Sequence, residues 1–366
     1  MLHIVLILLS SLLFGTFFLL LDFNIFKKIQ MTHSLKKTAE EMKLIEERIE
    51  KFINAQEEEF QNALDEFIRN AREADKKYRE RVDAYLLSVL ELPGTENRDR
   101  LITIARRLDF PSDCLVQIRD RHPGVIALGS RRAGLYNFTE AVDDMVAALE
   151  FLSSENQFEI LMGLARMGGA DAMIQAINKI KKNVIINERG FIEILSSFPG
   201  GKEKKKLFRS MIRGDTDYIA ALFLKAAGKD MVKTLMKDVV AVLHNGNKEV
   251  RAAAVHCFAR LGSKAPAEEL IHALEDPDWE VRALAAKALG AVKVHEASIA
   301  LFRALNDQQW WVRQNAANAL TGHPGYEALF ILAAESGDEY TKDSIVSALE
   351  NMGSPLLLRS IRVLTA

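Results

Sequence analysis

Histidine and cysteine are the residues of this sequence best suited to catalysis or metal binding, but their spacing forms no known motif. Cys114 and Cys257 are the only cysteines, and neither lies in a CxxC pair. Of the eight histidines, none belongs to an HExxH motif, and only His295 precedes a glutamate. A metal ion needs several converging ligands, which one His-Glu dipeptide cannot supply. We therefore expect no catalytic residues, no metal site and no cofactor.

Tryptophan is a second residue type with an informative spacing. The three tryptophans of the chain are Trp279, Trp310 and Trp311, and the first two precede Val281 and Val312 by the same two positions. If equivalent turns of a repeat lie side by side, the indoles line one edge, where exposed tryptophans are typical anchors for partners. The alternative is that each indole fills space over a neighbouring turn, because tryptophan is commonly mostly buried. This stripe is the first partner-binding hypothesis.

Basic residues are concentrated between Lys179 and Arg213. This stretch has ten Lys or Arg against three Glu, whereas the whole chain has 48 basic and 50 acidic residues. Such a patch attracts acidic protein surfaces, anionic lipid headgroups or nucleic acid, or it is a solvated turn around a Pro-Gly-Gly sequence. Nucleic acid ranks lowest, because the nearby phenylalanines have apolar neighbours typical of a helix core. The second partner-binding hypothesis comprises Lys202, Lys204, Lys205, Lys206, Arg209 and Arg213.

Internal repeats provide the elements that would position these residues. A Val-Arg dipeptide recurs three times at a constant interval of about 31 residues, which lies within the range of helical repeat proteins. The surrounding segments are EVRAAAVHCFARLG, EVRALAAKALGAV and WVRQNAANALTGH. An apolar residue eight positions after each valine extends the pattern in both directions at nearly the same interval. These apolar positions are Leu164, Leu195, Leu224, Phe258, Leu289, Leu320 and Leu349.

Each period contains two amphipathic helices joined by short polar turns. One such pair cannot bury its own apolar face, so neighbouring pairs must stack. A hydrophobic content of 49% excludes a mainly disordered chain, and two cysteines exclude a disulfide scaffold. The predicted fold class is all-α: an α-solenoid of helix pairs, preceded by a long helical stalk and one N-terminal transmembrane helix.

The repeats resemble the HEAT family, in particular the short HEAT-like repeats also found in phycobilisome lyases. The resemblance is carried by the pattern VRxxAAxALG in the repeats that begin near Glu249, Glu280 and Trp311, and it is weaker in the earlier repeats, where the Val-Arg pair is absent. The weaker matches lie around Phe158, Phe191 and Tyr218. The resemblance implies a structural ladder between neighbouring repeats, built from an Asp in the inter-helix turn and an Arg six residues later. The ladder residues would be Asp276 with Arg282, Asp307 with Arg313, and Arg251, which follows Asn245 instead of an Asp.

Two groups of enzymes share this type of scaffold, and they define the alternative function. Deoxyhypusine hydroxylase binds a di-iron centre through several His-Glu dipeptides, and the lyases handle bilin chromophores. Similarity of the scaffold does not carry the chemistry. A lyase-type enzyme or chromophore-handling protein nevertheless stays the alternative, and it predicts a concave pocket with convergent His, Asp or Tyr side chains.

The N-terminal part of the chain predicts a membrane anchor and a stalk. Residues 2–21 contain no charged side chain and, at about 1.5 Å per residue, are long enough to span about 30 Å of hydrocarbon. Lysines follow this run and none precedes it, so the N-terminus would lie outside and the solenoid in the cytoplasm. Residues 27–92 lack Gly and Pro and have an apolar stripe at helical spacing.

That stripe predicts one long amphipathic helix, either a coiled coil or a helix that folds back on the following domain. The predicted domains are an anchor at 1–23, the long helix at 24–92, degenerate helical repeats at 97–153 and the solenoid at 154–366. The predicted function is a single-pass plasma (inner) membrane scaffold, not an enzyme, that binds protein partners of a membrane-associated assembly. Anionic lipid and a second copy of the stalk are further partner hypotheses.

Overall fold

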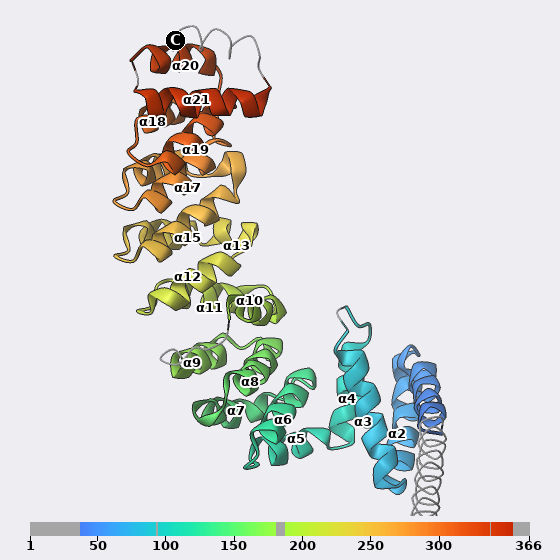
Figure 1. Ribbon diagram of the computed structural model, residues 1–366. Helices are drawn as coiled ribbons and strands as arrows, with labels where there is room; N and C mark the ends of the chain where they lie inside the picture. Colours follow the sequence, from blue (N-terminus) through green and yellow to red (C-terminus); the bar gives the residue numbers. More distant parts are fainter. Residues whose placement is uncertain (1–36, 93, 181–186, 337, 354–366) are drawn as a thin grey trace, which may run out of the picture. The chain divides into compact units, whose positions relative to one another are not determined.

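The computed structural model of the protein describes residues 37–92, 94–180, 187–336 and 338–353, and all regular structure in these residues is helical. The chain divides into two compact units (Figure 1). Unit 1 comprises the described residues up to Gln117 together with Leu135–Phe138. Unit 2 comprises Ile118–Gly134 and the described residues from Thr139 onward. The boundary therefore falls inside the predicted group of degenerate repeats at 97–153.

Unit 1 is a small helical bundle. Its core contains three phenylalanines, with Phe52 lying 6.0 Å from Phe60 and 5.6 Å from Phe67 between ring centroids. Arg100 covers the Phe60 ring at 4.5 Å and donates hydrogen bonds to the carbonyl oxygens of Ile53 and Ala55. The helices are residues 37–53, α2 (Glu57–Glu73), α3 (Lys76–Leu90), α4 (Arg98–Arg107) and α5 (Phe110–Ile118).

The prediction of one long stalk helix at 24–92 is wrong for the described part of that segment. The chain leaves the helical conformation after residue 53 and again at Ala74, whose ψ is 166°. Asp75 then caps α3 by accepting a 2.7 Å hydrogen bond from the backbone N–H of Tyr78. The apolar stripe is buried within unit 1, because three shorter helices can cover one another's apolar faces.

Unit 2 is a stack of helix pairs. The first helices of the pairs are α7 (Val142–Ala148), α9 (Ala170–Ile180), α11 (Lys202–Ile212), α13 (Lys229–Thr234) with α14 (Met236–Ala241), α16 (Ala267–His272), α18 (His295–Ala304) and α20 (Tyr326–Ser336). The second helices are α8 (Ser154–Met167), α10 (Glu188–Ser197), α12 (Asp217–Ala226), α15 (Lys248–Ala259), α17 (Trp279–Leu289), α19 (Trp310–Leu320) and α21 (Glu339–Met352). A further helix, α6 (Pro123–Leu135), precedes the first pair, and short 3-10 turns include η2 (Leu149–Phe151), η4 (Val242–His244) and η6 (Ala273–Glu275).

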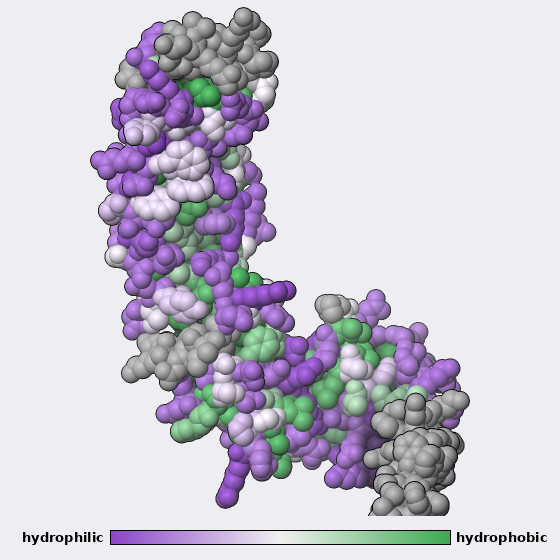
Figure 2. All heavy atoms as spheres, in the orientation of Figure 1, coloured by the Kyte–Doolittle hydropathy of each residue, from purple (hydrophilic) through white to green (hydrophobic). Residues whose placement is uncertain are grey.

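Each second helix packs against the second helix of the next pair, from α8 through α21. All seven apolar positions used to trace the repeat lie in these second helices and are at most 1% exposed. The small residues Ala253, Ala254, Ala285, Ala286, Ala316 and Ala317 are buried in three of them. Figure 2 shows a mainly hydrophilic surface over these helices, with hydrophobic atoms between them. The prediction of an all-α solenoid is therefore supported.

The predicted localisation needs correction. Within the described ranges, no helix combines the length and apolar character needed to cross a bilayer. This finding overturns the prediction of a single-pass membrane protein with an outside N-terminus and a cytoplasmic solenoid. The apolar run at 2–21, which was the physical reason for that prediction, lies outside the described residues.

Candidate functional site

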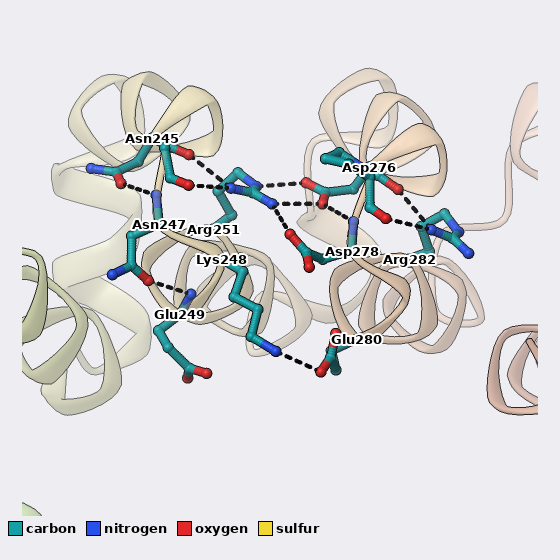
Figure 3. Close-up of polar contacts among 11 residues, drawn as sticks. Asn245, Asn247, Lys248, Glu249, Arg251, Asp276, Asp278, Glu280 and Arg282 are labelled. Carbon is teal, nitrogen blue, oxygen red and sulfur yellow. Dashed lines mark hydrogen bonds and ion pairs between the residues drawn. The ribbon is translucent and has the colours of Figure 1, made fainter.

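A ladder of arginine and aspartate side chains joins the turns of successive repeats (Figure 3). Arg251, in α15, makes a bidentate pair with Asp276 in the next turn, with Nε–Oδ2 at 2.8 Å and Nη2–Oδ1 at 2.9 Å. Its Nη2 also contacts Asp278 at 2.6 Å. Arg282, in α17, repeats this geometry one period later with Asp307, at 2.7 and 3.0 Å.

The same arginines also hold the turn of their own repeat. Nη1 of Arg251 donates to the carbonyl oxygen of Asn245 at 2.9 Å, and Nη1 of Arg282 donates to that of Asp276 at 2.9 Å. The side chains of Arg251 and Asp276 are each only 8% exposed. Each arginine–aspartate pair, which we call a rung, therefore joins two turns inside the protein. The N–H donors of its arginine are occupied by these structural hydrogen bonds.

Short polar side chains shape the turns from within. Asp276 accepts a hydrogen bond from the backbone N–H of Asp278 at 2.9 Å, and Asp307 accepts one from Gln309 at 2.8 Å. Asn245 does the same for Asn247 at 2.7 Å. Asp and Asn favour such turns because their side chains reach the backbone two residues further on.

The first end of the ladder explains why an asparagine stands at position 245. Its side-chain amide donates to Asp217 Oδ1 at 3.1 Å. Asp217 lies seven residues before Leu224, as Arg251 lies seven residues before Phe258, so the preceding repeat presents a carboxylate here and no guanidinium. An aspartate at 245 would place two carboxylates together without a cation between them, whereas the asparagine supplies a donor.

At the other end, the ladder stops at Arg313. This side chain donates from Nη1 to the carbonyl oxygen of Asp307 at 2.8 Å, but its buried Nε finds no acceptor among the described residues. Asp338 lies one repeat period after Asp307, yet it caps α21 by accepting from the Thr341 N–H at 2.8 Å. Asp338 directly precedes α21, as Asp278 directly precedes α17, so it occupies the capping position and not the position of Asp276, two residues earlier.

The pKa shifts follow from these contacts. The hydrogen bonds that Arg251 donates to Asp276 raise the pKa of Arg251, although burial opposes the shift. Burial alone would raise the pKa of Asp307, but hydrogen bonds from Arg282 and the Gln309 N–H outweigh it and hold that pKa below its usual value. Both groups are thus kept in their charged forms, as expected for structural ion pairs.

The tryptophans lie at the first turns of two stacked helices. Trp279 begins α17 and is partly exposed, whereas Trp310 and Trp311 begin α19 and are 47% and 56% exposed. The Trp310 and Trp311 rings meet edge to face, with centroids 4.6 Å apart. These two indoles thus form an exposed aromatic cluster on unit 2.

The predicted basic residues belong to α11 and its C-terminal end, and several already have partners. Lys206 pairs with Asp171 at 2.7 Å, while Arg209 and Arg213 pair with the buried Asp238 at 3.1 and 2.5 Å. The buried part of this cluster is structural. Lys202 and Lys205 contribute, with Lys206, Arg209 and Ser210, to the lining of a shallow depression of about 430 Å³.

The sixth predicted basic residue, Lys204, turns inward. Its ammonium group donates to the carbonyl oxygen of Phe198 at 3.1 Å, and burial lowers its pKa. Lys204 thus closes the turn before α11 and does not extend the exposed basic surface.

Sequence reasoning missed two features of this unit. Tyr340, the second residue of α21, is 65% exposed, and the Arg313 guanidinium lies 5.4 Å from its ring centroid. The second feature is an open groove of about 720 Å³ between the first helices of two repeats. Its lining includes His244, Glu268, Glu269, His272 and Glu275. Tyr340 lies 29 residues after Trp311 instead of 31, so a search at the strict repeat spacing does not find it. The groove depends on how the helices pack, which the sequence does not reveal.

The cysteines and histidines do not form a reactive site in the described residues. Cys257 is fully buried, donates to the carbonyl oxygen of Leu224, and burial raises its pKa to about 12. Cys114 is also fully buried. No group of three or more His, Cys, Asp or Glu in the described ranges could hold a metal ion.

The comparisons with known proteins agree with this architecture. Residues 236–321 match the family model for HEAT repeats, a stretch that runs from α14 to α19 and contains every rung of the ladder. None of the curated proteins gives a significant sequence match. The repeat match and the all-helical stacking together support a HEAT-like repeat protein.

Two solved structures illustrate the similarity. Human deoxyhypusine hydroxylase in complex with glycerol is 15% identical, with 77% of this chain and 96% of that chain covered and a TM-score of 0.28. The complex of CpcE and CpcF of phycocyanin lyase from Nostoc sp. PCC7120 is 14% identical, with coverages of 70% and 93% and a TM-score of 0.25. TM-scores this low carry no argument about function.

Proposed function

We propose that this protein is a non-enzymatic scaffold whose HEAT-like solenoid binds protein partners. The proposal depends on one observation above all, the exposed pair Trp310 and Trp311 at the start of α19. Tryptophan is enriched among the residues that dominate protein–protein binding energy, because it combines a large apolar area with few rotatable bonds. Trp279 begins the preceding second helix and belongs to the same edge.

The rigid backing of this edge also favours a binding role. The ladder joins the turns that lead into α15, α17 and α19, so the first residues of these helices are held in fixed register. A preorganised surface loses less conformational entropy on binding than a mobile one. The exposed lysines of α11 offer a second surface, suited by charge to an acidic partner.

The alternative, a lyase-type enzyme, is represented in the described residues by the groove that contains His244 and His272. Two residues of its lining, Arg251 and Asp276, bond each other in the ladder and are therefore not free to act as acid or base. Purified protein of this kind would carry bound chromophore or metal. Visible absorbance and metal content of the full-length protein therefore separate the two functions.

The binding proposal is tested by capturing partners with the full-length protein and with the double variant Trp310→Ala/Trp311→Ala. We expect specific partners to be lost with the double variant. Phe151→Ala is the matched control, because Phe151 is an aromatic residue that is 84% exposed elsewhere on unit 2. Recovery of the same partners with all three proteins would contradict the proposal.

A further inference from the structure

The contacts of the repeat fix which positions are neighbours along this edge. Lys248, the first residue of α15, pairs at 2.7 Å with Glu280, the second residue of α17 (Figure 3). One period later, the same two positions hold Trp279 and Trp311. Because α15, α17 and α19 pack successively, these two indoles occupy neighbouring positions on the edge.

Tyr340 continues the series into the next repeat. It is the second residue of α21, which packs against α19, and Trp310 is the first residue of α19. Arg313, one turn after Trp310, places its guanidinium over the Tyr340 ring. We name the set of Trp279, Trp310, Trp311 and Tyr340 the aromatic edge.

The aromatic edge has accessible ring surface. Trp310, Trp311 and Tyr340 are 47%, 56% and 65% exposed. In the edge-to-face pair of Trp310 with Trp311, the edge of one ring contacts a single face of the other. The rings can therefore accept flat apolar groups from a ligand between and above them.

The secondary structure narrows the form of the ligand. The described residues contain no strand, so a peptide has no sheet edge to extend. An amphipathic helix needs a continuous apolar groove, whereas these aromatic residues project from the first turns of separate helices. Among the common peptide-recognition modes, docking of a polyproline II segment on exposed aromatic rings fits best.

The spacing agrees with this mode. A polyproline II helix has three residues per turn and rises about 3.1 Å per residue, so every third residue returns to one face after roughly 9 Å. Packed helices generally lie about 8–10 Å apart, so we expect a similar separation between the parts of the aromatic edge that come from successive helices. Glu339, the exposed first residue of α21, lies beside Tyr340 and favours a basic residue next to the prolines.

From these observations we propose that the aromatic edge binds a proline-rich segment of a protein partner in the polyproline II conformation, with prolines three residues apart and an adjacent Lys or Arg. This inference rests on the proposed function, because it specifies the chemistry of the partner that the scaffold binds.

Intrinsic fluorescence tests the inference directly, since all three tryptophans of the chain belong to the aromatic edge. Full-length protein is titrated with a peptide of nine prolines followed by one lysine. The control ligands are a Gly-Ser peptide of equal length with the same lysine, and cellohexaose. We expect a saturable change in tryptophan emission with the proline peptide, and binding at least about tenfold weaker with both controls.

Two variants localise the signal. Tyr340→Ala retains all three tryptophans, and we expect it to weaken binding of the proline peptide about tenfold. Phe151→Ala should leave the affinity within about twofold, because Phe151 lies outside the aromatic edge. Thermal unfolding followed by circular dichroism establishes that both variants are folded.

Three results would overturn the inference. They are the absence of a saturable change up to about 1 mM proline peptide, equal binding of the Gly-Ser peptide, and preferential binding of cellohexaose. If partner capture depends on Trp310 and Trp311 but the proline peptide does not bind, the scaffold function stands and only the polyproline inference fails.

Discussion

Arg251 illustrates how a single side chain can define a repeat. Its guanidinium bonds the carboxylate of Asp276 in the following turn and the carbonyl oxygen of Asn245 in its own turn. A lysine could not do this, because an ammonium group lacks the planar fork that pairs with both carboxylate oxygens. The charged guanidinium of Arg251 thus holds two successive turns of the solenoid together.

We predict that Arg251→Ala strongly destabilises unit 2. The substitution leaves the buried carboxylate of Asp276 without its partner, and such losses typically cost about 3–5 kcal/mol. Lys248→Ala is the matched control, since the Lys248–Glu280 pair is 44% and 36% exposed and solvent screening should make its contribution much smaller. Urea denaturation followed by tryptophan fluorescence measures both values. Equal destabilisation by the two variants would contradict the structural role of the ladder.

A second prediction concerns the buried His323. Its Nε2–H donates to the carbonyl oxygen of Leu289 at 3.1 Å, and its Nδ1 lies 2.9 Å from the Ser298 hydroxyl. Burial lowers its pKa from 6.5, the hydrogen bond to Leu289 opposes this, and nearby Lys293 lowers it further. The folded protein therefore favours the neutral imidazole.

The sign of the pH dependence follows from linkage. Below pH 6.5 the unfolded chain binds a proton that folded His323 resists, so the free energy of unfolding decreases as the pH falls. We expect the melting temperature to decrease between about pH 7.5 and 5.5, and His323→Gln to show a smaller decrease over the same range. An identical pH dependence in both proteins would show that His323 does not contribute.

At the scale of elements, a glycine contact sets how closely α6 approaches α8. A Cβ atom placed on Gly134 would overlap Gly163 Cα, and one placed on Gly163 would lie 2.5 Å from the carbonyl oxygen of Ser130. Both obstacles are backbone atoms, which cannot move aside as a flexible side chain would. The two helices can cross here only because neither residue has a side chain.

We predict that Gly163→Ala destabilises unit 2 by about 1–3 kcal/mol, the usual cost of overpacking. Alanine has the higher helix propensity, so an isolated helix would be stabilised by about 1 kcal/mol instead. Gly124→Ala, in the first turn of α6, meets no atom within 4 Å and serves as the control. Thermal unfolding by circular dichroism distinguishes the two expectations, and a more stable Gly163→Ala protein would contradict the close crossing.

The sequence predicted the repeats of unit 2 better than the helices of unit 1. In the repeats, an apolar position such as Phe258 or Leu289 recurs at nearly constant spacing, and each recurrence must occupy an equivalent buried site. In unit 1, the apolar stripe has the same period whether a helix continues or breaks and folds back. Only a local signal, such as the capping side chain of Asp75, marks the break, and helical periodicity does not record it.

The candidate site was predictable only as a set of positions. The repeat spacing places Trp279 and Trp310 in equivalent turns, but the exposure of a side chain depends on its tertiary neighbours. The basic residues illustrate the same limit, because Arg209 and Arg213 converge on a buried Asp238 that belongs to a later helix, α14. Tyr340 escaped detection because α21 starts earlier relative to the repeat than α19 does.

At the scale of the whole molecule, each of the two units has its own hydrophobic core. All three tryptophans belong to unit 2, whereas helical circular dichroism arises from both units. Because domains with separate cores need not unfold together, we predict that the two signals give different urea transitions. Coincident transitions would contradict independent unfolding. The variant Arg251→Ala should shift the fluorescence transition more than the circular dichroism transition, since Arg251 lies in unit 2.

The ladder also has a consequence for how such a chain could change in length. The segment from Asp276 to Asn306 presents a carboxylate to the arginine before it and an arginine to the carboxylate after it. A tandem duplication of this segment would therefore create a new junction identical in chemistry to the existing ones. Duplication of a repeat inside the array therefore preserves every arginine–aspartate pair. Asn245 and Arg313 mark the two ends of the ladder, where a duplication would leave a ladder residue without its partner.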